Sequence, residues 1–274
     1  MTDNNYLYHY TNVETLALIL KNHTIRLNSL DKMDDKQEQM TADLKNIGQF
    51  IYISSWTDEA KESIPMWNQY ASIDQGVRIK LRKNPFKIYD NTVKSLSKVC
   101  KLPVIGDDSG SPLKSIIPLE EIFLNGFFSQ QALSMELLYQ IVYTDDKDKL
   151  YPKIVRIDET NFHIATGILG KYKSTYWKFQ KEWRYILRII PLDINQGPDQ
   201  IAREFQLVTN RILRGIEKQP FSYYDMVIAD DAFSEMEITL APKVSAGTRV
   251  IVEQLVSSFN PNATVKDSDL LGLI

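Results

Sequence analysis

The chain has 274 residues, of which 43% are hydrophobic and 24% are charged, and its formal net charge at pH 7 is −3. This composition is ordinary for a soluble globular protein with a sizeable core, and it provides no overall attraction to nucleic acid or to an anionic membrane. The single cysteine, Cys100, excludes an internal disulfide and a cysteine-rich zinc site.

The hydropathy of the sequence predicts neither a secretory signal nor a membrane-spanning helix. The first residues, MTDNNYLYHY, lack the basic and apolar segments of a secretory signal, and no apolar run approaches the roughly 20 residues of a membrane-spanning helix. We therefore expect a cytoplasmic protein without membrane contact. No repeat or flexible linker divides the sequence, which favours one α+β domain over residues 1–274, with a mainly helical insertion around residues 86–170.

The first third of the chain predicts strands separated by one amphipathic helix. In VETLALILKN the apolar residues recur at helical spacing, and Thr11 or Asn12 is the expected cap of this helix. A short helix, MWNQYA, follows Pro65. The polar residues 31–46 are expected to form a loop and a surface helix. The strands are expected at residues 5–10, 24–30, 49–57 and 76–81.

The clearest strand of the second half covers residues 178–190. Its alternation places Gln180, Glu182 and Arg184 on one face, opposite an apolar face that begins at Trp183. Residues 104–112 read as an exposed loop. Helices are expected at residues 118–143, 151–169, 199–216 and 248–259. Further strands are expected at residues 226–231, 236–242 and 263–268.

Four short motifs are spread over most of the chain, from about residue 6 to residue 268. They are YHYT around His9, MW-x-x-YA after the strand at 49–57, KEWR in the late strand, and an I-x-L-x-P turn. Together they resemble the motifs of a bacterial family of unknown function. Ala241 stands where that family has glycine before the proline.

The same segments are similar, more distantly, to the ADP-ribosyltransferase superfamily. LYHYTNVETLALILKNHTIRL resembles the strand, histidine and helix of poly-ADP-ribose polymerases, with Tyr10 where glycine is usual. IYISS resembles their second motif, and Gln180-Lys181-Glu182 resembles their Q-x-E. The resemblance implies split antiparallel β-sheets around a nucleotide cleft with flanking helices. It covers residues 86–170 poorly.

The resemblance also implies a role for each matched residue. Cleavage of the nicotinamide–ribose bond of NAD⁺ develops positive charge on the ribose, which the carboxylate of Glu182 would stabilise, while Gln180 would orient the acceptor. His9 would hold ribose hydroxyls. The implied NAD-binding residues are His9, Tyr10, Thr11, Ser54 or Ser55 as a brace for Glu182, and Trp67 or Tyr70 as the plane that stacks on nicotinamide.

Basic and aromatic side chains alternate over residues 171–188, an arrangement that suits phosphates and stacked bases. We expect this segment to contact the NAD pyrophosphate or a protein or nucleic-acid acceptor, or else to be an ordinary strand with solvated lysines. The basic residues concerned are Lys171, Lys173, Lys178, Arg184 and Arg188. The acidic run Asp31, Asp34, Asp35 and Glu38 is flanked by lysines and is expected to be a solvated loop, so no metal site is predicted.

Three functions remain open from the sequence. The first is an NAD-dependent ADP-ribosyltransferase or NAD glycohydrolase acting on a macromolecule, for which the resemblance implies a toxin or defence effector. The second is an inactive nucleotide- or partner-binding module, which Tyr10 in place of glycine favours. The third is a metal-dependent nuclease using Asp58, Glu59 and Lys61. Taken singly, His9 is typical of an aromatic cluster and Glu182 of a solvated strand face. The order of the motifs along the chain favours the transferase.

Overall fold

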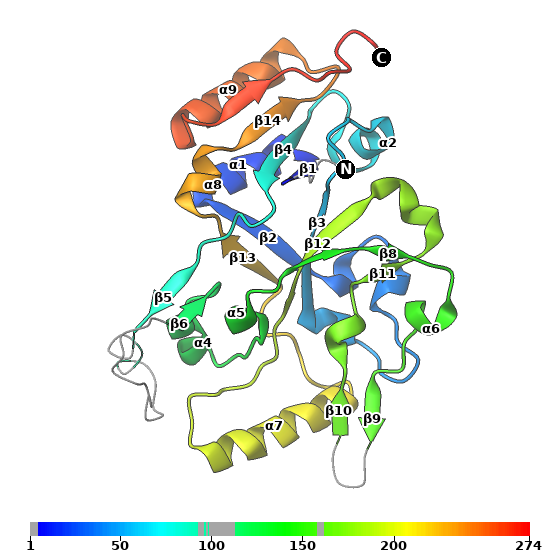
Figure 1. Ribbon diagram of the computed structural model, residues 1–274, viewed down its shortest axis with the longest axis vertical. Helices are drawn as coiled ribbons and strands as arrows, with labels where there is room; N and C mark the ends of the chain where they lie inside the picture. The colour runs from blue at the N-terminus through cyan, green and yellow to red at the C-terminus, as the bar shows by residue number, and fades with distance from the viewer. Residues whose placement is uncertain (1–4, 93–95, 97, 99–112, 158–161) are drawn as a thin grey trace.

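A nine-stranded β-sheet organises the protein, as a computed structural model shows for residues 5–92, 96, 98, 113–157 and 162–274 (Figure 1). The main sheet is open and mostly antiparallel, with strand order β13-β2-β3-β1-β4-β14-β15, and β12 joins it on β3 with β7 beyond. Its strands are β1 (Tyr6–Asn12), β2 (Thr24–Ser29), β3 (Ile51–Thr57), β4 (Gly76–Arg82), β7 (Leu138–Gln140), β12 (Glu182–Arg188), β13 (Tyr223–Val227), β14 (Glu237–Leu240) and β15 (Thr264–Lys266). This mixed arrangement confirms the predicted α+β class.

The sheet forks along one edge of β3. On the opposite edge, β12 pairs with β3 over its whole length, from Glu182 against Thr57 to Arg188 against Ile51. On the forked edge, β2 pairs only with the first half of β3, and β1 pairs only at Thr57. The strands β1 and β2 therefore diverge from β3, and α1 (Val13–Asn22) connects them across the gap.

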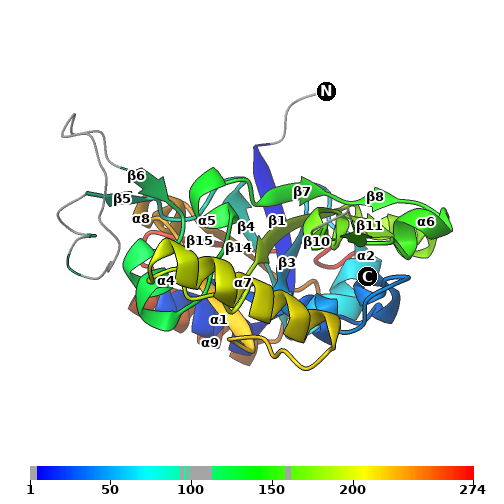
Figure 2. The same cartoon turned by 90° about the horizontal axis from the view of Figure 1, so that it is seen from below.

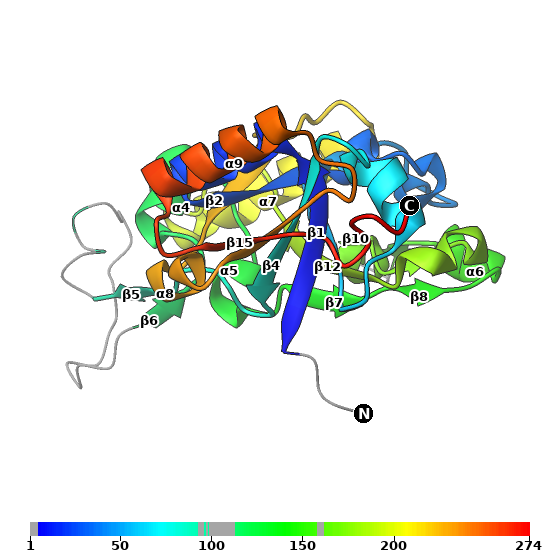
Figure 3. The same cartoon turned by 90° about the horizontal axis from the view of Figure 1, so that it is seen from above.

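Helices cover the sheet at both ends of the molecule. Figure 3 shows α1 beside α9 (Ala246–Phe259) over the β1–β4–β14 part of the sheet, with α8 (Asp230–Ser234) nearby. At the other end of the long axis lies α7 (Pro198–Leu213), which is nearest the viewer in Figure 2. No helix of the described residues is long and apolar enough to cross a membrane.

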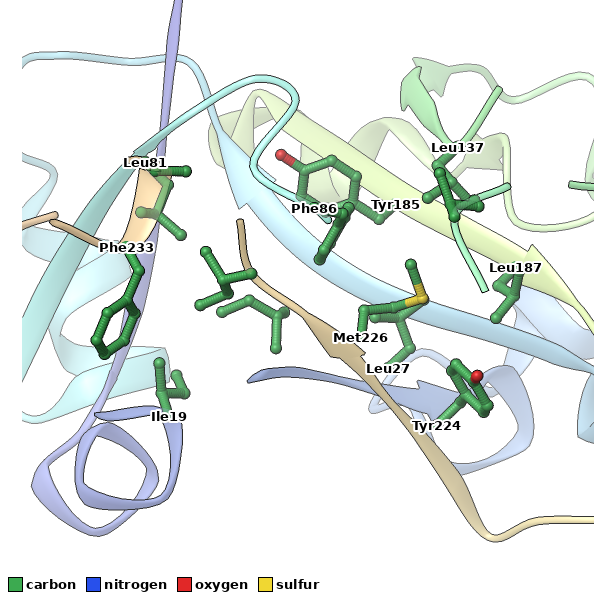
Figure 4. Close-up of a cluster of buried hydrophobic side chains, with 14 of the residues drawn as sticks. Ile19, Leu27, Leu81, Phe86, Leu137, Tyr185, Leu187, Tyr224, Met226 and Phe233 are labelled. Carbon is green, nitrogen blue, oxygen red and sulfur yellow. The ribbon is translucent and has the colours of Figure 1, made fainter. Parts of the chain in front are cut away.

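Alternate residues of β12 face two different layers. Tyr185 and Leu187 belong to the largest apolar cluster, in which Figure 4 shows Tyr185 beside Phe86. The other face carries Glu182, Arg184, Ile186 and Arg188, and all four are buried. A glutamate on a strand ordinarily lies on a solvated face, but Glu182 is buried.

Local signals predicted several elements well. The side chain of Asn12 accepts a hydrogen bond of 2.7 Å from the backbone N–H of Thr15, so Asn12 is the cap of α1. Strands β1 to β4 and helix α9 lie close to their predicted positions. MWNQYA forms α2 (Ile64–Met66) and a π turn (Trp67–Ala71). The late strand is shorter than predicted, because residues 175–180 form a 3₁₀ turn and Lys181 is left-handed. The helix at 199–216 ends earlier, at Leu213, before the left-handed Gly215.

The described part of residues 86–170 is not mainly helical, which corrects the prediction. The range 118–143 contains two short helices and then strand, because Gly126 adopts a left-handed conformation that ends the first helix. The range 151–169 contains a two-stranded hairpin and a 3₁₀ turn (Thr166–Ile168) rather than a helix. Residues 104–112 lie outside the described residues. The elements are β5 (Tyr89–Asn91), β6 (Leu113–Ser115), α4 (Leu119–Asn125), α5 (Gln131–Ser134), β8 (Val142–Tyr143), α6 (Lys147–Leu150), β9 (Val155–Ile157), β10 (Phe162–Ile164) and, just after this range, β11 (Tyr172–Lys173).

Candidate functional site

Two adjoining pockets open where the sheet forks. The first, here called the inner pocket, has a volume of about 100 Å³ and is lined by residues of β1, β3, β12, the 33–38 segment, Tyr70 and the turn before β12. The second, here called the fork pocket, has a volume of about 380 Å³ and lies between β1, α1, β2 and β3. The residues that line both are His9, Met33, Asp34, Ser55 and Tyr70.

A buried cluster of four charged side chains forms one wall of the inner pocket. Arg184 donates through Nε to Glu182 Oε1 at 2.6 Å and through Nη2 to Glu182 Oε2 at 3.1 Å. Its Nη1 donates to Glu38 and to the carbonyl of Gly170. Lys173 Nζ lies 3.2 Å from Glu38 Oε1 and 3.1 Å from Glu182 Oε2. Two carboxylates and two cations thus compensate each other, with all four side chains at most 7% exposed.

The cluster keeps Glu182 ionised despite its burial. Burial by itself would raise the pKa of Glu182, but the charges of Arg184 and Lys173, with hydrogen bonds from Arg184 and Ser55, outweigh it and lower the pKa to about 2. For Arg184 the signs are reversed. Burial would lower its pKa, and the carboxylates of Glu182 and Glu38 raise it above the ordinary value. The wall of the pocket therefore carries a fixed negative group within a cluster that is neutral overall.

His9 bridges the forked edge of β3. Its Nδ1 lies 2.8 Å from the carbonyl oxygen of Ser55, a position of β3 that pairs with neither β1 nor β2. Because a carbonyl only accepts, Nδ1 must carry the proton, and in the neutral ring Nε2 is then an acceptor. Burial lowers the pKa of His9, and the hydrogen bond to Ser55 offsets this only in part. His9 is therefore a neutral ring of defined tautomer, 5.0 Å from Trp56 between ring centroids.

Gln180 and Tyr70 close the inner pocket above the charged cluster. Gln180 Oε1 accepts from Lys173 Nζ at 2.8 Å, and its amide group donates to the hydroxyl of Tyr70. Burial first, and then the charge of Glu182, raise the pKa of Tyr70, so its hydroxyl stays protonated at neutral pH. Gln180 lies outside β12 and not on a strand face as predicted, but it still contacts the group that binds Glu182.

The remaining predicted residues divide between the pocket and the core. Ser55 lines both pockets. Ser54 lines the fork pocket, and its hydroxyl accepts from Trp56 Nε1 at 3.0 Å. Of the two serines, only Ser55 contacts Glu182. Thr11 lines the fork pocket.

Trp67 and Tyr10 pack against each other beside the pocket. Their ring centroids are 5.0 Å apart, edge to face. Trp67 is fully buried and donates from Nε1 to Glu62 at 2.8 Å, so its ring has no open face for a nicotinamide. Tyr10 lines the inner pocket, and its hydroxyl accepts from the backbone N–H of Ser63. Of the two residues predicted to stack on nicotinamide, Tyr70 is thus the one that lines the pockets.

Two predictions about charged residues are wrong. Glu38 and Asp35 are buried rather than parts of a solvated loop. Lys173 and Arg184 are held inside the cluster, and Arg188 is buried, so these three do not form a free basic surface. Two other lysines of the 171–188 segment are accessible to solvent. Lys178 is exposed, and Lys171 is half-buried.

Glu38 and Trp177 are among the lining residues of the inner pocket that the sequence analysis did not predict as site members. Glu38 stands in a polar stretch without periodicity, and its partners are more than 130 residues away, so no local pattern marks it. The excess of cations over acids at 171–188 was the available signal, because buried cations require carboxylates. Trp177 lines the inner pocket and has Lys173 Nζ 4.8 Å from its ring centroid.

The residues of the nuclease hypothesis are not gathered into a ligand set. Glu59 pairs with Lys181 at the surface. Within the ranges that the structure describes, no group of three or more histidine, cysteine, aspartate or glutamate residues is placed to hold a metal ion. Comparison of the chain with models of known protein families, with curated proteins and with solved structures finds no match.

Proposed function

We propose that the protein cleaves the nicotinamide–ribose bond of NAD⁺ and transfers ADP-ribose to a macromolecular acceptor or to water. The observation that carries this proposal is that His9 and Glu182, 173 positions apart in the chain, line one pocket at the fork of the sheet. The order of the motifs predicted a shared pocket for them. Their chemical states are also suitable, because one is a neutral imidazole and the other an ionised carboxylate.

The proposed chemistry assigns a different task to each group. When the bond to nicotinamide breaks, the ribose acquires positive charge, and a preorganised carboxylate lowers the energy of that state. Glu182 is held rigidly by four hydrogen bonds and ion pairs, so it needs no reorganisation during the reaction. Nε2 of His9 would accept from a ribose hydroxyl, and Tyr70 or Trp177 would present a plane to the nicotinamide ring.

The sizes of the two pockets support a ligand with two parts. The fork pocket, at about 380 Å³, is within the range of roughly 300–1,000 Å³ that small-molecule sites occupy. The inner pocket, at about 100 Å³, adjoins the fork pocket and shares five lining residues with it. We therefore propose that nicotinamide enters the inner pocket and that the adenosine half occupies the fork pocket. The shared residues His9 and Ser55 would then lie beside the bond between the halves.

The test is to incubate the protein with NAD⁺ and to measure nicotinamide release, with and without cell extract as a source of acceptors. We expect Glu182→Gln to lower the rate by at least about a hundredfold, as removal of a preorganised electrostatic group does. Glu237→Gln is the matched control, because Glu237 also pairs with two lysines, Lys80 and Lys266, and lies outside both pockets. Equal rates of Glu182→Gln and wild type, with both proteins folded by circular dichroism, would contradict catalysis at this site.

One observation favours a second function, nucleotide binding without turnover. Both carboxylate oxygens of Glu182 already accept from cations, and the residue is only 4% exposed. An engaged carboxylate is less available to a ribose hydroxyl than a free one. Calorimetry with ADP-ribose and NAD⁺ separates the two functions, because a sensor binds both ligands and releases no nicotinamide. His9→Gln should weaken binding in either case.

A further inference from the structure

A third pocket lies at the far end of β12, away from the fork. It has a volume of about 190 Å³ and is enclosed by the turn before β3, the residues around β10, the end of β12 and one face of α7. Most of its lining is apolar, including Ile47, Ile164, Ile190 and Val208. Glu182 and Arg188 are six positions apart on an extended strand, which is roughly 20 Å, so this pocket is distinct from the inner pocket. We call it the α7 pocket.

The α7 pocket contains one buried cation, Arg188, which is 9% exposed. Its Nε donates to the carbonyl of Thr166 at 3.1 Å, and Nη2 donates to the carbonyls of Gly167 at 3.1 Å and Leu169 at 3.2 Å. Nη1 donates to no carbonyl or carboxylate of the described residues. These bonds fix the guanidinium against the segment 166–169 but do not neutralise it, since every acceptor is an uncharged carbonyl.

No carboxylate within the described part of the chain pairs with Arg188. Burial lowers the pKa of Arg188, and the group that opposes this effect is the hydroxyl of Tyr139. A second cation is near, because Arg188 also lowers the pKa of the half-buried Lys171, after burial itself. A guanidinium stays protonated in proteins, so the charge persists. Buried charges are normally paired, and an uncompensated one beside an apolar cavity is unusual.

We infer that the α7 pocket binds a small carboxylate with a compact apolar body, whose anionic group pairs with Arg188. An apolar cavity of about 150 Å³ admits a molecule of the size of benzene, so about 190 Å³ fits such a ring with one carboxylate. Charge complementarity selects the anion, because Arg188 has no carboxylate partner among the described residues. The apolar lining selects the body, which is an aromatic ring or a short aliphatic chain.

The test follows the methyl resonances of Ile164, Ile190 and Val208 by NMR during titration with benzoate and with hexanoate, which distinguish the two bodies. Benzamide and hexanamide serve as uncharged analogues of the same shape. We expect at least one carboxylate to shift these resonances and to bind at least about tenfold more tightly than its amide. The body of the carboxylate that binds identifies the class of ligand. If neither acid binds at concentrations up to about 10 mM, or if acid and amide bind equally, the inference is overturned.

Variants separate the charge from the cavity. Arg188→Met should abolish the preference for acid over amide, whereas Arg203→Met, which removes an exposed arginine of α7, should leave it unchanged. Thr209→Phe fills the pocket while Arg188 stays in place, and it should abolish binding of both forms. If Arg188→Met does not fold, Arg188→Lys is the alternative variant. It keeps the positive charge and should retain the preference for acid over amide. If a folded Arg188→Met protein still prefers the acid to the amide, the anion does not pair with Arg188 and the inference is overturned.

Discussion

The two ends of β12 each bury an arginine, on the same face and four residues apart, and the protein compensates them differently. Arg184 bonds two carboxylates, Glu182 and Glu38. Arg188 bonds three backbone carbonyls. Both also bind one continuous stretch of chain, since the acceptor carbonyls run from Thr166 to Gly170.

This difference shows that burial alone does not define what a charged residue does. At the Glu182 end the charges cancel within the protein, so the cluster holds a carboxylate ionised beside a pocket and requires no ligand to do so. At the Arg188 end the positive charge is left for an external anion. The same strand therefore presents a self-sufficient electrostatic site at one end and an incomplete one at the other.

The largest expected effect comes from Arg184→Met, which would leave Glu182 and Glu38 buried with only Lys173 between them. Breaking a buried ion pair by removing one partner costs about 3–5 kcal/mol, so we expect a loss of that order in the free energy of unfolding, measured in urea. Arg249→Met is the control, because Arg249 forms exposed pairs with Glu253 and Asp267 and should cost at most about 1 kcal/mol. Adding Glu38→Gln to Arg184→Met should recover part of the loss, and strict additivity would argue against a coupled cluster.

The second effect is a dependence of stability on pH that belongs to the Glu182 end. The folded pKa of Glu182, about 2, lies below the ordinary value of 4.5. The stabilisation is therefore present above about pH 4.5 and is lost as the pH falls towards 2. Unfolding in urea at a series of pH values should show a steeper loss for wild type than for Glu182→Gln. Arg188→Met should keep the wild-type slope, and a flatter slope in that variant would contradict the separation of the two ends.

Arg188→Met should destabilise the protein less than Arg184→Met does. It removes three hydrogen bonds to carbonyls but leaves no carboxylate unpaired, and it also relieves an uncompensated charge. We expect a cost of roughly 1–3 kcal/mol in the free energy of unfolding. Equal costs for the two substitutions would indicate that Arg188 has a counter-charge of its own in solution. Addition of a carboxylate ligand should stabilise wild type and not this variant.

The smallest contrast concerns two tyrosines, one near each end. The hydroxyl of Tyr143 accepts from the backbone N–H of Glu182 at 2.8 Å, and Tyr143→Phe leaves that donor without a partner. We expect Tyr143→Phe to cost about 1 kcal/mol in thermal or urea unfolding. The hydroxyl of Tyr139 donates to the exposed carbonyl of Glu136 and also interacts with Arg188, which keeps three carbonyl acceptors of its own. Because water can satisfy the Glu136 carbonyl, Tyr139→Phe should cost less than Tyr143→Phe. The reverse order would contradict the larger contribution expected of the hydrogen bond between Tyr143 and the backbone of Glu182.

Much of the fold was predictable because its signals are local. The helix α1 follows from an apolar stripe and the Asn12 cap, β3 follows from a run of β-branched and aromatic residues, and β4 follows from alternating apolar residues after Gly76. The hairpin of β9 and β10 was missed because short strands depend on their partner more than on their own sequence. The helix predicted at 118–143 failed at Gly126, which allows a left-handed end that a periodic pattern does not reveal.

By itself the sequence determined a mixed fold with His9 on the first strand and Glu182 on the late strand, although His9 lies in the middle of β1 and not at its end as predicted. Only the tertiary structure decided that these two share a pocket and that Glu38 is buried with Lys173 and Arg184. It also decided that Arg184 is paired while Arg188 is not. The reason is physical. Alternation along a strand tells which residues share a face, but charge compensation depends on groups that come together across more than a hundred residues of chain.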